Sequence, residues 1–342
     1  MATIEKVLDS IHIGQASGGN LVIPAGKLDK LFVGDTTPKN LDSVWVTLPN
    51  GDMLKMIRAG KRFVAVAIGD KGAYSDDGIN WTETTMPSEG NWCGVTYGGG
   101  RFVAVAHTSN KAAYSMDGIN WTETTMPSSG NWQGVTYGNG KFVSVDSASG
   151  NNAAAYSDDG INWTAATLPS SANWRSVTYG NGKFVAVASG ANKAAYSTDG
   201  INWTAATMPS TSGWTAVTYG NGRFVAVPNS NAAAYSDDGI NWTAATMPSI
   251  TNWYSVTYGN GKFVAVSYNN TKAAYSTDGI TWTAATLPSS AYWCGVAYGN
   301  GRFVAVGNTN KAAYSDDGIN WTAATLPSSG NWFGVAYSDV AA

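Results

Sequence analysis

Seven aspartates recur in the same short context along this chain, and a repeated carboxylate is the feature that could most readily do chemistry. Each follows Ser-x and precedes Gly-x-x-Trp, as in YSDDGINW and YSTDGINW. The seven positions lie 39 to 42 residues apart: Asp77, Asp117, Asp159, Asp199, Asp238, Asp278 and Asp317. Aspartates of this kind can bind a metal ion, act as acid or base in catalysis, or hold a turn.

The residues around these aspartates favour a structural turn over a metal site. A calcium loop alternates carboxylates and ends on a bidentate Glu, but in three copies the residue before the key Asp is Met116, Thr198 or Thr277. In a structural turn the Asp accepts hydrogen bonds from its own amides, Gly supplies a positive φ, and Trp packs beneath. We therefore predict a structural role for all seven aspartates and no metal site.

The remaining residues do not suggest a catalytic set. The two histidines, His12 and His107, are isolated, so that Ser-His-Asp and zinc constellations lack their components. Nearly every Asp belongs to a repeated turn, which leaves no pair of facing carboxylates for glycoside hydrolysis. Four arginines share one repeat slot with lysines and are interpreted as solvated turn residues, whereas Arg175 stands apart: Arg62, Arg101, Arg223 and Arg302. We predict no catalysis and no cofactor.

The aspartates belong to a repeat that contains four short stretches typical of strands. The stretches are WxxVTY (a), KFVAV (b), KAAYS (c) and NWTAAT (d), rich in Val, Thr, Tyr, Phe and Trp. GNG or GGG joins a to b, and the turn from Ser75 to Trp81 with its six copies, the Asp turns, joins c to d. Four antiparallel strands in each of seven repeats predict an all-β, seven-bladed β-propeller of four-stranded antiparallel blades.

The first 44 residues do not repeat, and we predict that residues 1–44 form an N-terminal adapter or docking segment, with the propeller in residues 45–342. In the adapter Ile4, Val7, Leu8 and Ile11 fall on one helical stripe. A segment of this size does not build an independent core, so we expect it to rest on the propeller or on a partner. A poorly ordered leader is the alternative.

Closure of the ring poses a choice, because eight candidate inner strands exist for seven blades. Residues 53–58 align with a worn copy of stretch a, and NWFGVAY near the C-terminus is a good copy. We favour Trp332 to Tyr337 as the inner strand of the first blade, with residues 53–58 displaced. In the alternative, residues 53–58 keep the inner position and the last strand pairs elsewhere, for example with another subunit.

Composition argues against several classes of partner. The net charge is −3 and charged residues make up only 13% of the chain, which disfavours nucleic acid and anionic membrane surfaces. No apolar run approaches the ~20 residues of a membrane span, and the N-terminus lacks the pattern of a signal peptide. Cys93 and Cys294 occupy the same slot of two repeats, which argues against a disulfide framework.

The sequence YSDDGINW resembles the Asp-box, or BNR repeat, of sialidase-like β-propellers, although one residue fewer separates Asp from Gly here. The resemblance extends over the repeated part of the chain and implies a c–d turn on the outer part of each blade, away from an active site. It also implies what an enzyme of this family needs: an arginine cluster, a Tyr nucleophile with a Glu partner, and a general acid. Near-identical repeats, low charge and a unique adapter additionally resemble phage virion appendage proteins.

Variation among the repeats indicates where a ligand would bind. In a propeller the a–b and c–d turns share one face, and the b–c and d–a loops share the other; here the first pair is nearly uniform and the second differs in every repeat. The residue after each stretch-a Trp also varies, at the expected mouth of the second face: Cys93, Gln133, Arg175, Thr215, Tyr254, Cys294 and Phe333. We predict that a neutral polar ligand such as a glycan is bound by Gln133, Arg175, Thr215, Tyr254, Tyr292 and Phe333.

Two alternatives stay open at this point. Loops that are free to drift would vary in the same way without recognising anything. The Trp residues that begin each stretch a either form a platform for sugar rings or pack between blades, and we favour packing: Trp92, Trp132, Trp174, Trp214, Trp253, Trp293 and Trp332.

Together these features predict a non-enzymatic binding or structural protein. We expect a phage virion surface protein, a tail or capsid appendage, that attaches to a virion or other assembly protein through residues 1–50. Its variable face would meet a host glycan or protein receptor, without nucleic acid or membrane insertion. The alternatives are a bacterial lectin-like or scaffold propeller, cytoplasmic or non-classically exported, and a degenerate sialidase-like glycosidase.

Overall fold

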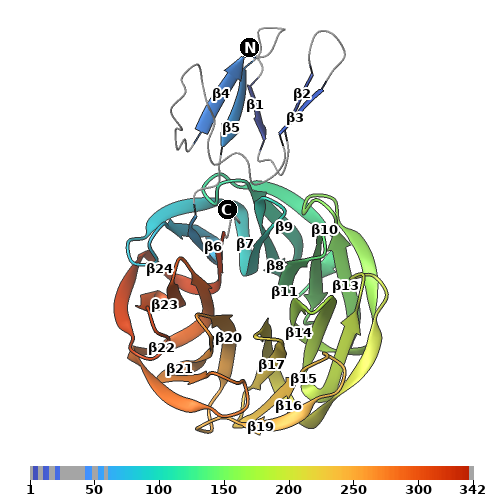
Figure 1. Ribbon diagram of the computed structural model, residues 1–342, viewed down its shortest axis with the longest axis vertical. Helices are drawn as coiled ribbons and strands as arrows, with labels where there is room; N and C mark the ends of the chain where they lie inside the picture. The colour runs from blue at the N-terminus through green and yellow to red at the C-terminus, as the bar shows by residue number, and fades with distance from the viewer. Residues whose placement is uncertain are drawn as a thin grey trace.

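The computed structural model describes residues 61–338 in full and the backbone of five short strands that precede them. In the described part, seven four-stranded antiparallel blades stand in a closed ring around a central axis (Figure 1). The predicted all-β propeller is therefore confirmed. The described residues form no helix that is long and apolar enough to cross a membrane.

Nineteen strands build the ring, and several of them turn a corner without interruption. In chain order they are β6 (Phe63–Ser75), β7 (Thr82–Gly98), β8 (Arg101–His107), β9 (Ser109–Ser115), β10 (Thr122–Gly130), β11 (Trp132–Gly138), β12 (Lys141–Asp146), β13 (Asn151–Ser157), β14 (Thr164–Gly180), β15 (Lys183–Ser197), β16 (Thr204–Gly220), β17 (Arg223–Pro228), β18 (Ala232–Ser236), β19 (Thr243–Thr246), β20 (Trp253–Gly259), β21 (Lys262–Ser276), β22 (Thr283–Gly299), β23 (Arg302–Ser315) and β24 (Thr322–Tyr337). Strands such as β14 contain stretch d of one blade and stretch a of the next. Hydrogen bonding therefore links the blades into sheets of ten and nine strands.

The C-terminal end of β24 closes the ring as the inner strand of blade 1. Trp332 pairs with Ala67 and Tyr337 pairs with Phe63, in the register that the same stretches adopt in the other blades. The rings of Phe63 and Tyr337 lie 4.8 Å apart, as the corresponding Tyr–Phe pairs of other blades do. The favoured closure is confirmed, and blades 2 to 7 follow in chain order from Trp92.

The strands before residue 61 form two small groups of their own. They are β1 (Thr3–Lys6), β2 (Ile11–Gly14), β3 (Asn20–Ile23), β4 (Ser43–Thr47) and β5 (Met53–Ile57). Strand β5 pairs with β1 and β4, so it is displaced from the ring, while β2 and β3 form a hairpin.

The helical stripe predicted near the N-terminus is wrong where the structure describes it. Ile4 lies in β1 and Ile11 in β2, whereas Val7 and Leu8 lie outside the described residues. Thr3, Ile4, Ile11 and Ile13 are β-branched and favour strands, which outweighs a helical spacing of four apolar residues. The adapter role and the boundary at residue 44 stay predictions.

The core of the ring consists of apolar layers between neighbouring blades. Strand b is buried over five successive residues, for example from Phe184 to Ala188, because a blade covers it on each side. The Trp that begins each stretch a is at most 1% exposed. Its indole N–H donates to the carbonyl of the Ser four residues earlier, as Trp214 does to Ser210 at 3.2 Å. These tryptophans pack between blades, so the sugar-platform alternative is wrong for them.

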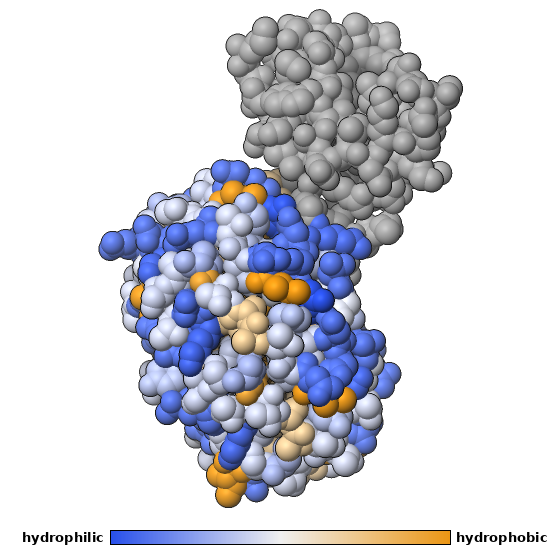
Figure 2. All heavy atoms as spheres, turned by 90° about the vertical axis from the view of Figure 1, so that its left-hand side faces the viewer, coloured by the Kyte–Doolittle hydropathy of each residue, from blue (hydrophilic) through white to orange (hydrophobic). Residues whose placement is uncertain are grey.

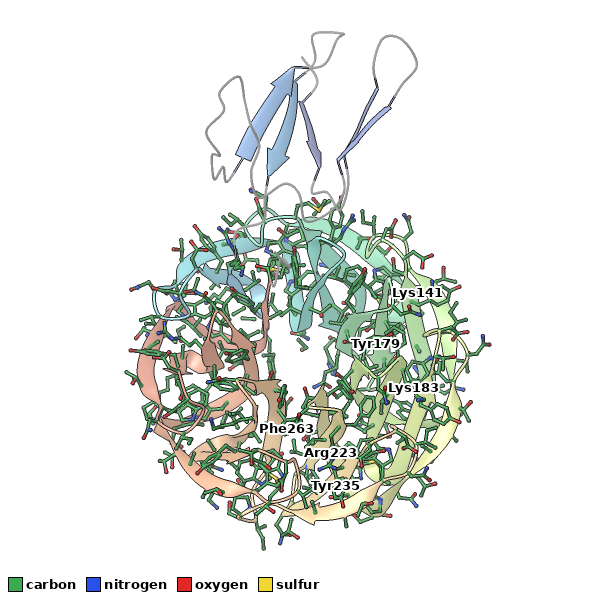
Figure 3. The ribbon with its side chains drawn as sticks, viewed as in Figure 1. Lys141, Tyr179, Lys183, Arg223, Tyr235 and Phe263 are labelled. Atoms are coloured by element: carbon green, nitrogen blue, oxygen red, sulfur yellow. The ribbon has the colours of Figure 1, made fainter. Side chains whose placement is uncertain are left out.

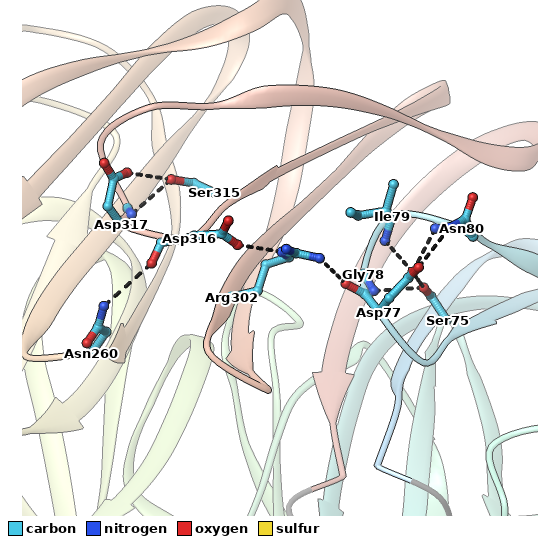
Figure 4. Close-up of polar contacts among 11 residues, drawn as sticks. Ser75, Asp77, Gly78, Ile79, Asn80, Asn260, Arg302, Ser315, Asp316 and Asp317 are labelled. Atoms are coloured by element: carbon cyan, nitrogen blue, oxygen red, sulfur yellow. Dashed lines mark hydrogen bonds and ion pairs between the residues drawn. The ribbon is translucent and has the colours of Figure 1, made fainter.

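Each Asp turn closes on its own carboxylate (Figure 4). In blade 1 the Asp77 Oδ1 accepts hydrogen bonds from the Ser75 hydroxyl at 2.9 Å and from the Ile79 and Asn80 amides at 2.8 Å. Burial raises the pKa of Asp77, but these hydrogen bonds outweigh it and lower the pKa to about 2. The geometry repeats in all seven turns, so this carboxylate is occupied by the turn itself.

Three of the four arginines at the start of strand b, Arg62, Arg223 and Arg302, link one blade to the next, which corrects their interpretation as solvated turn residues. In blade 7 the Arg302 Nε donates to Asp316 and its terminal N–H donates to the Asp77 carbonyl of blade 1, both at 2.7 Å (Figure 4). Arg223 makes the equivalent link from blade 5 to blade 6 and stacks 4.8 Å from the centre of the Tyr235 ring (Figure 3). This hydrogen bond between blades could not be predicted from one repeat, because the carbonyl acceptor belongs to another repeat.

Candidate functional site at the mouth of the variable face

The two faces of the ring are divided as the repeat predicts. On the constant face, the a–b turns meet the Asp turns, as where the Asn260 side chain donates to the Asp316 carbonyl at 3.5 Å (Figure 4). On the variable face, b–c loops meet d–a loops, as where the Asn91 amide donates to the Thr108 hydroxyl at 2.9 Å. Each repeat therefore contributes its uniform turns to one rim and its variable loops to the other.

The inner strands approach one another so closely at the mouth that the position after the variable residue must stay small. A Cβ on Gly334 would lie 2.9 Å from the Cys93 carbonyl, and one on Gly134 would lie 3.0 Å from the Ser176 Cα. This close packing of stretch a places the seven variable residues in one ring around the channel, here called the inner ring: Cys93, Gln133, Arg175, Thr215, Tyr254, Cys294 and Phe333.

Three inner-ring side chains from different blades converge. The Tyr254 hydroxyl of blade 6 lies 3.4 Å from an Arg175 terminal nitrogen of blade 4 and 3.5 Å from the Gln133 amide nitrogen of blade 3. The Arg175 guanidinium also lies 5.7 Å from the centre of the Tyr254 ring. Burial raises the pKa of Tyr254 to about 12, although Arg175 opposes the shift, so the phenol stays protonated and can donate.

A stack of tyrosines extends outward from this cluster. Tyr268 lies between the other two, 5.4 Å from the centre of Tyr254 and 4.3 Å from the centre of Tyr292, with planes tilted by 30° and 13°. Tyr292 is 36% exposed. The stack therefore presents aromatic faces and edges from the mouth to the outer part of the variable face, between blades 6 and 7.

Arg175 leaves the mouth with an unneutralised cation. In contrast to Arg302, it pairs with no carboxylate within residues 61–338, and its Nε is buried without a hydrogen-bond partner. Its charge acts on His107, whose pKa is lowered by burial and further by Arg175, so the imidazole is neutral at pH 7. His107 is thus not isolated as predicted, because it also lies 3.4 Å from the Ser147 hydroxyl.

The other residues of the inner ring differ in burial and in hydrogen bonding. Thr215 is buried, and its hydroxyl lies 2.9 Å from the Val227 carbonyl and 2.5 Å from the Trp253 carbonyl, so its one proton is donated within the ring of blades. Cys294 is buried, while Phe333 and Cys93 are half-buried. Burial raises the pKa of the Cys93 thiol to about 11 and also raises that of Cys294, so neither is a thiolate nucleophile near neutral pH.

A second variable ring surrounds the first and was missed in the sequence. It is formed by the second residue after stretch b, here called the outer ring: Ile68, His107, Ser147, Ser189, Asn229, Tyr268 and Asn308. Two of its members, His107 and Tyr268, contact or influence inner-ring residues. The signal was available, since this slot also differs between repeats, but only the pairing of stretches a and b across the hairpin reveals that the slots adjoin.

The chemistry that these groups offer is recognition by hydrogen bonds and ring stacking. The mouth combines a free cation, a neutral imidazole, a carboxamide and protonated phenols. Within residues 61–338, no three His, Cys, Asp or Glu side chains come together as a metal site. The carboxylate that acts electrostatically on His107 is Asp146. Its Oδ1 accepts from the Asn131 and Ala148 amides at 2.9 and 2.7 Å, and its Oδ2 accepts from the Asn151 carboxamide at 2.7 Å.

Comparison with known proteins shows likeness of fold. The sequence matches no protein-family model and no curated protein sequence. A streptogramin B lyase structure aligns with a TM-score of 0.65 and 14% identity over 72% of this chain and 86% of that chain. Virginiamycin B lyase from Staphylococcus aureus aligns with a TM-score of 0.62 and 18% identity over 69% of this chain and 84% of the lyase chain. YCF48 bound to a D1 peptide aligns with a TM-score of 0.55 and 15% identity over 70% of this chain and 82% of the YCF48 chain. These neighbours include enzymes and binding proteins, and at such identities the likeness establishes a β-propeller fold.

Proposed function

We propose that this propeller is a non-enzymatic recognition protein whose variable-face mouth binds a neutral glycan. The observation that carries the proposal is the convergence of Gln133, Arg175 and Tyr254 from three separate blades at the slot where the repeats differ most. The strands and the constant-face turns are nearly identical between repeats. Loop drift alone would not bring the varied side chains of the other face into mutual contact. Polar donors beside stacked aromatic rings are the groups that bind saccharides.

A lyase function has less support, even though lyases are among the structural neighbours. An enzyme of that kind needs a general base that can reach its substrate. His107 is the only imidazole among residues 61–338, and the carboxylate near it, Asp146, has its oxygens occupied by loop amides. The side chains at the mouth fit binding better than proton transfer.

We further propose, in line with the sequence resemblance, that the protein is a phage virion appendage that attaches through residues 1–50. The support is the contrast between a non-repeating N-terminal segment and a propeller whose variation gathers on one face. Mass spectrometry of purified particles would detect the chain at a fixed copy number per particle. Its absence from particles, together with release from virus-free producing cells, would favour the lectin-like or scaffold alternative.

The binding proposal is tested on an array of neutral and sialylated glycans with the full-length protein. Arg175→Ala should weaken the best neutral ligand by about tenfold or more, because a hydrogen bond to a charged group contributes about 1.5–3 kcal/mol. Tyr268→Ala should weaken it by about twofold to tenfold, because an aromatic contact contributes about 0.5–1.5 kcal/mol. Lys183→Ala on the constant face is the matched control and should bind like the parent. Equal binding by all four proteins, or turnover of a glycoside, would contradict the proposal.

A further inference from the structure

A hollow opens on the variable face between blades 1 and 2, beside the mouth. Its volume is about 370 Å³, within the range of small-ligand pockets. The walls come from three loops that differ from their counterparts in other blades: the b–c loop of blade 1 with Ile68, the d–a loop with Glu89 and Asn91, and the b–c loop of blade 2 with His107 and Ser109.

The hollow is left open by two small residues, Gly90 and Ala106, at positions where the junction of blades 2 and 3 carries Gly130 and the bulkier Asp146. The three atoms nearest to a Cβ on Gly90 would all belong to the ring of Trp92, the closest at 3.2 Å. At the junction of blades 2 and 3 the space above the equivalent Gly130 is taken by the Asp146 carboxylate.

The walls combine polar groups of balanced charge with one apolar side chain. Lys111 lines the hollow, but its ammonium already donates to the Ser88 hydroxyl at 3.0 Å and to the Glu89 carbonyl at 2.6 Å. Glu89 also lines the hollow with an exposed side chain, and its carboxylate repels anions. Ile68, at 37% exposure, offers an apolar surface beside the Asn91 carboxamide. A neutral polyhydroxyl ring satisfies both kinds of group.

The hollow and the mouth share a wall. His107 lines the hollow, its backbone amide donates to the Cys93 thiol of the inner ring, and its imidazole experiences the charge of Arg175. A chain of sugar units that starts at the mouth can therefore continue over His107 into the hollow without leaving the variable face.

We infer that the hollow between blades 1 and 2 is a second saccharide subsite, so that the ligand of this propeller is a neutral oligosaccharide. This inference rests on the proposed function of the mouth and specifies the ligand further. The two subsites act as one extended site, and the affinity rises with the number of sugar units until both are occupied.

The test is calorimetric titration of the full-length protein with neutral gluco-, galacto-, manno- and N-acetylglucosamine oligosaccharides, from monosaccharide to hexasaccharide. Asn91→Ala removes the amide of the hollow and Ile68→Ser removes its apolar wall. The matched controls are Asn331→Ala, in the same slot of another d–a loop, and Ile250→Ser, an apolar side chain that is 76% exposed on the same face.

We expect the best hexasaccharide to bind about tenfold more tightly than its monosaccharide, with each hollow variant losing about threefold to tenfold for the hexasaccharide only. The controls should stay within about twofold of the parent. Binding that Arg175→Ala weakens but that neither chain length nor the hollow variants change would overturn the second subsite and leave the mouth in place. A lack of binding to every saccharide would overturn the proposed function together with the inference.

Discussion

The clearest energetic prediction concerns the Asp turns, because one carboxylate organises each of them. In blade 5 Asp238 accepts from the Ser236 hydroxyl at 2.9 Å, from the Ile240 and Asn241 amides at 2.8 Å, and from the Asn241 carboxamide at 2.8 Å. Asp238→Ala removes all four acceptor contacts and leaves the half-buried Ile240 amide without its partner, whereas the exposed Asn241 donors turn to water. Hydrogen bonds to a charged group contribute about 1.5–3 kcal/mol when buried, and partial exposure of this turn reduces their effect. We expect a loss of about 2–3 kcal/mol in the free energy of unfolding.

The same contacts give the loss a definite pH dependence. Burial raises the pKa of Asp238, but hydrogen bonds from Asn241, Ile240 and Ser236 outweigh it, so the pKa in the folded protein is lowered. A carboxylate with a lowered folded pKa stabilises the protein above its unfolded pKa of about 3.9 and loses that contribution as the pH falls. The advantage of the parent over Asp238→Ala should be constant from about pH 5 to 8 and shrink below about pH 4.

The assay is urea unfolding followed by tryptophan fluorescence at several pH values, with Asp70→Ala as the control. Asp70 is an exposed acid in a b–c loop, and its replacement should change the free energy of unfolding by less than about 0.5 kcal/mol. Asp238→Asn keeps one acceptor oxygen and should fall between the two. If Asp238→Ala unfolds like Asp70→Ala, or if its deficit is the same at pH 3 as at pH 7, the carboxylate does not organise the turn as argued.

Three further outcomes follow from the packing. Arg302→Leu should lower the free energy of unfolding by about 1–2 kcal/mol, because its link to the next blade is lost. Arg101→Leu should lower it less, since the guanidinium of Arg101 stacks on the Tyr114 ring and makes no such link within residues 61–338. Equal losses for the two variants in urea unfolding would contradict the link. Trp332→Ala should cost about 3–5 kcal/mol and open the ring to proteolysis near the C-terminus, whereas a protease-resistant variant would show that another strand closes blade 1. Burial raises the pKa of Cys93 to about 11 and also raises the pKa of the more buried Cys294. A disulfide reagent at neutral pH should therefore modify Cys93 slowly and Cys294 more slowly still. Rapid modification of both thiols in the folded protein would refute this.

Most of the fold could be predicted because the residue types in each repeat indicate its strands and turns. GNG predicts a hairpin with two positive φ angles, and the structure has them at Asn139 and Gly140, with φ of 47° and 75°. The alternation of strands and turns predicts a four-stranded antiparallel blade, and the number of repeats predicts the number of blades in the ring. The N-terminal strands were not predicted, since a short unrepeated segment offers two periodicities at once.

Contacts between repeats were the part that local patterns could not predict. The Gly of each Asp turn has a positive φ, but its second role depends on a neighbour: a Cβ on Gly239 would collide with Val185 of the preceding blade. The link from Arg302 to Asp77 joins residues at opposite ends of the chain. The variable residues were predicted to lie at one mouth, but the pairing of Tyr254 with Arg175 and Gln133 depends on the radius of the ring.

The proposed function requires that a ligand binds at the variable-face mouth. A crystal structure of the full-length protein with its tightest neutral oligosaccharide would test this directly. We predict sugar rings against Tyr254, Tyr268 or Tyr292, with a hydroxyl bonded to Arg175. A saccharide bound on the constant face or along the outer strands, with the mouth unchanged, would contradict the account.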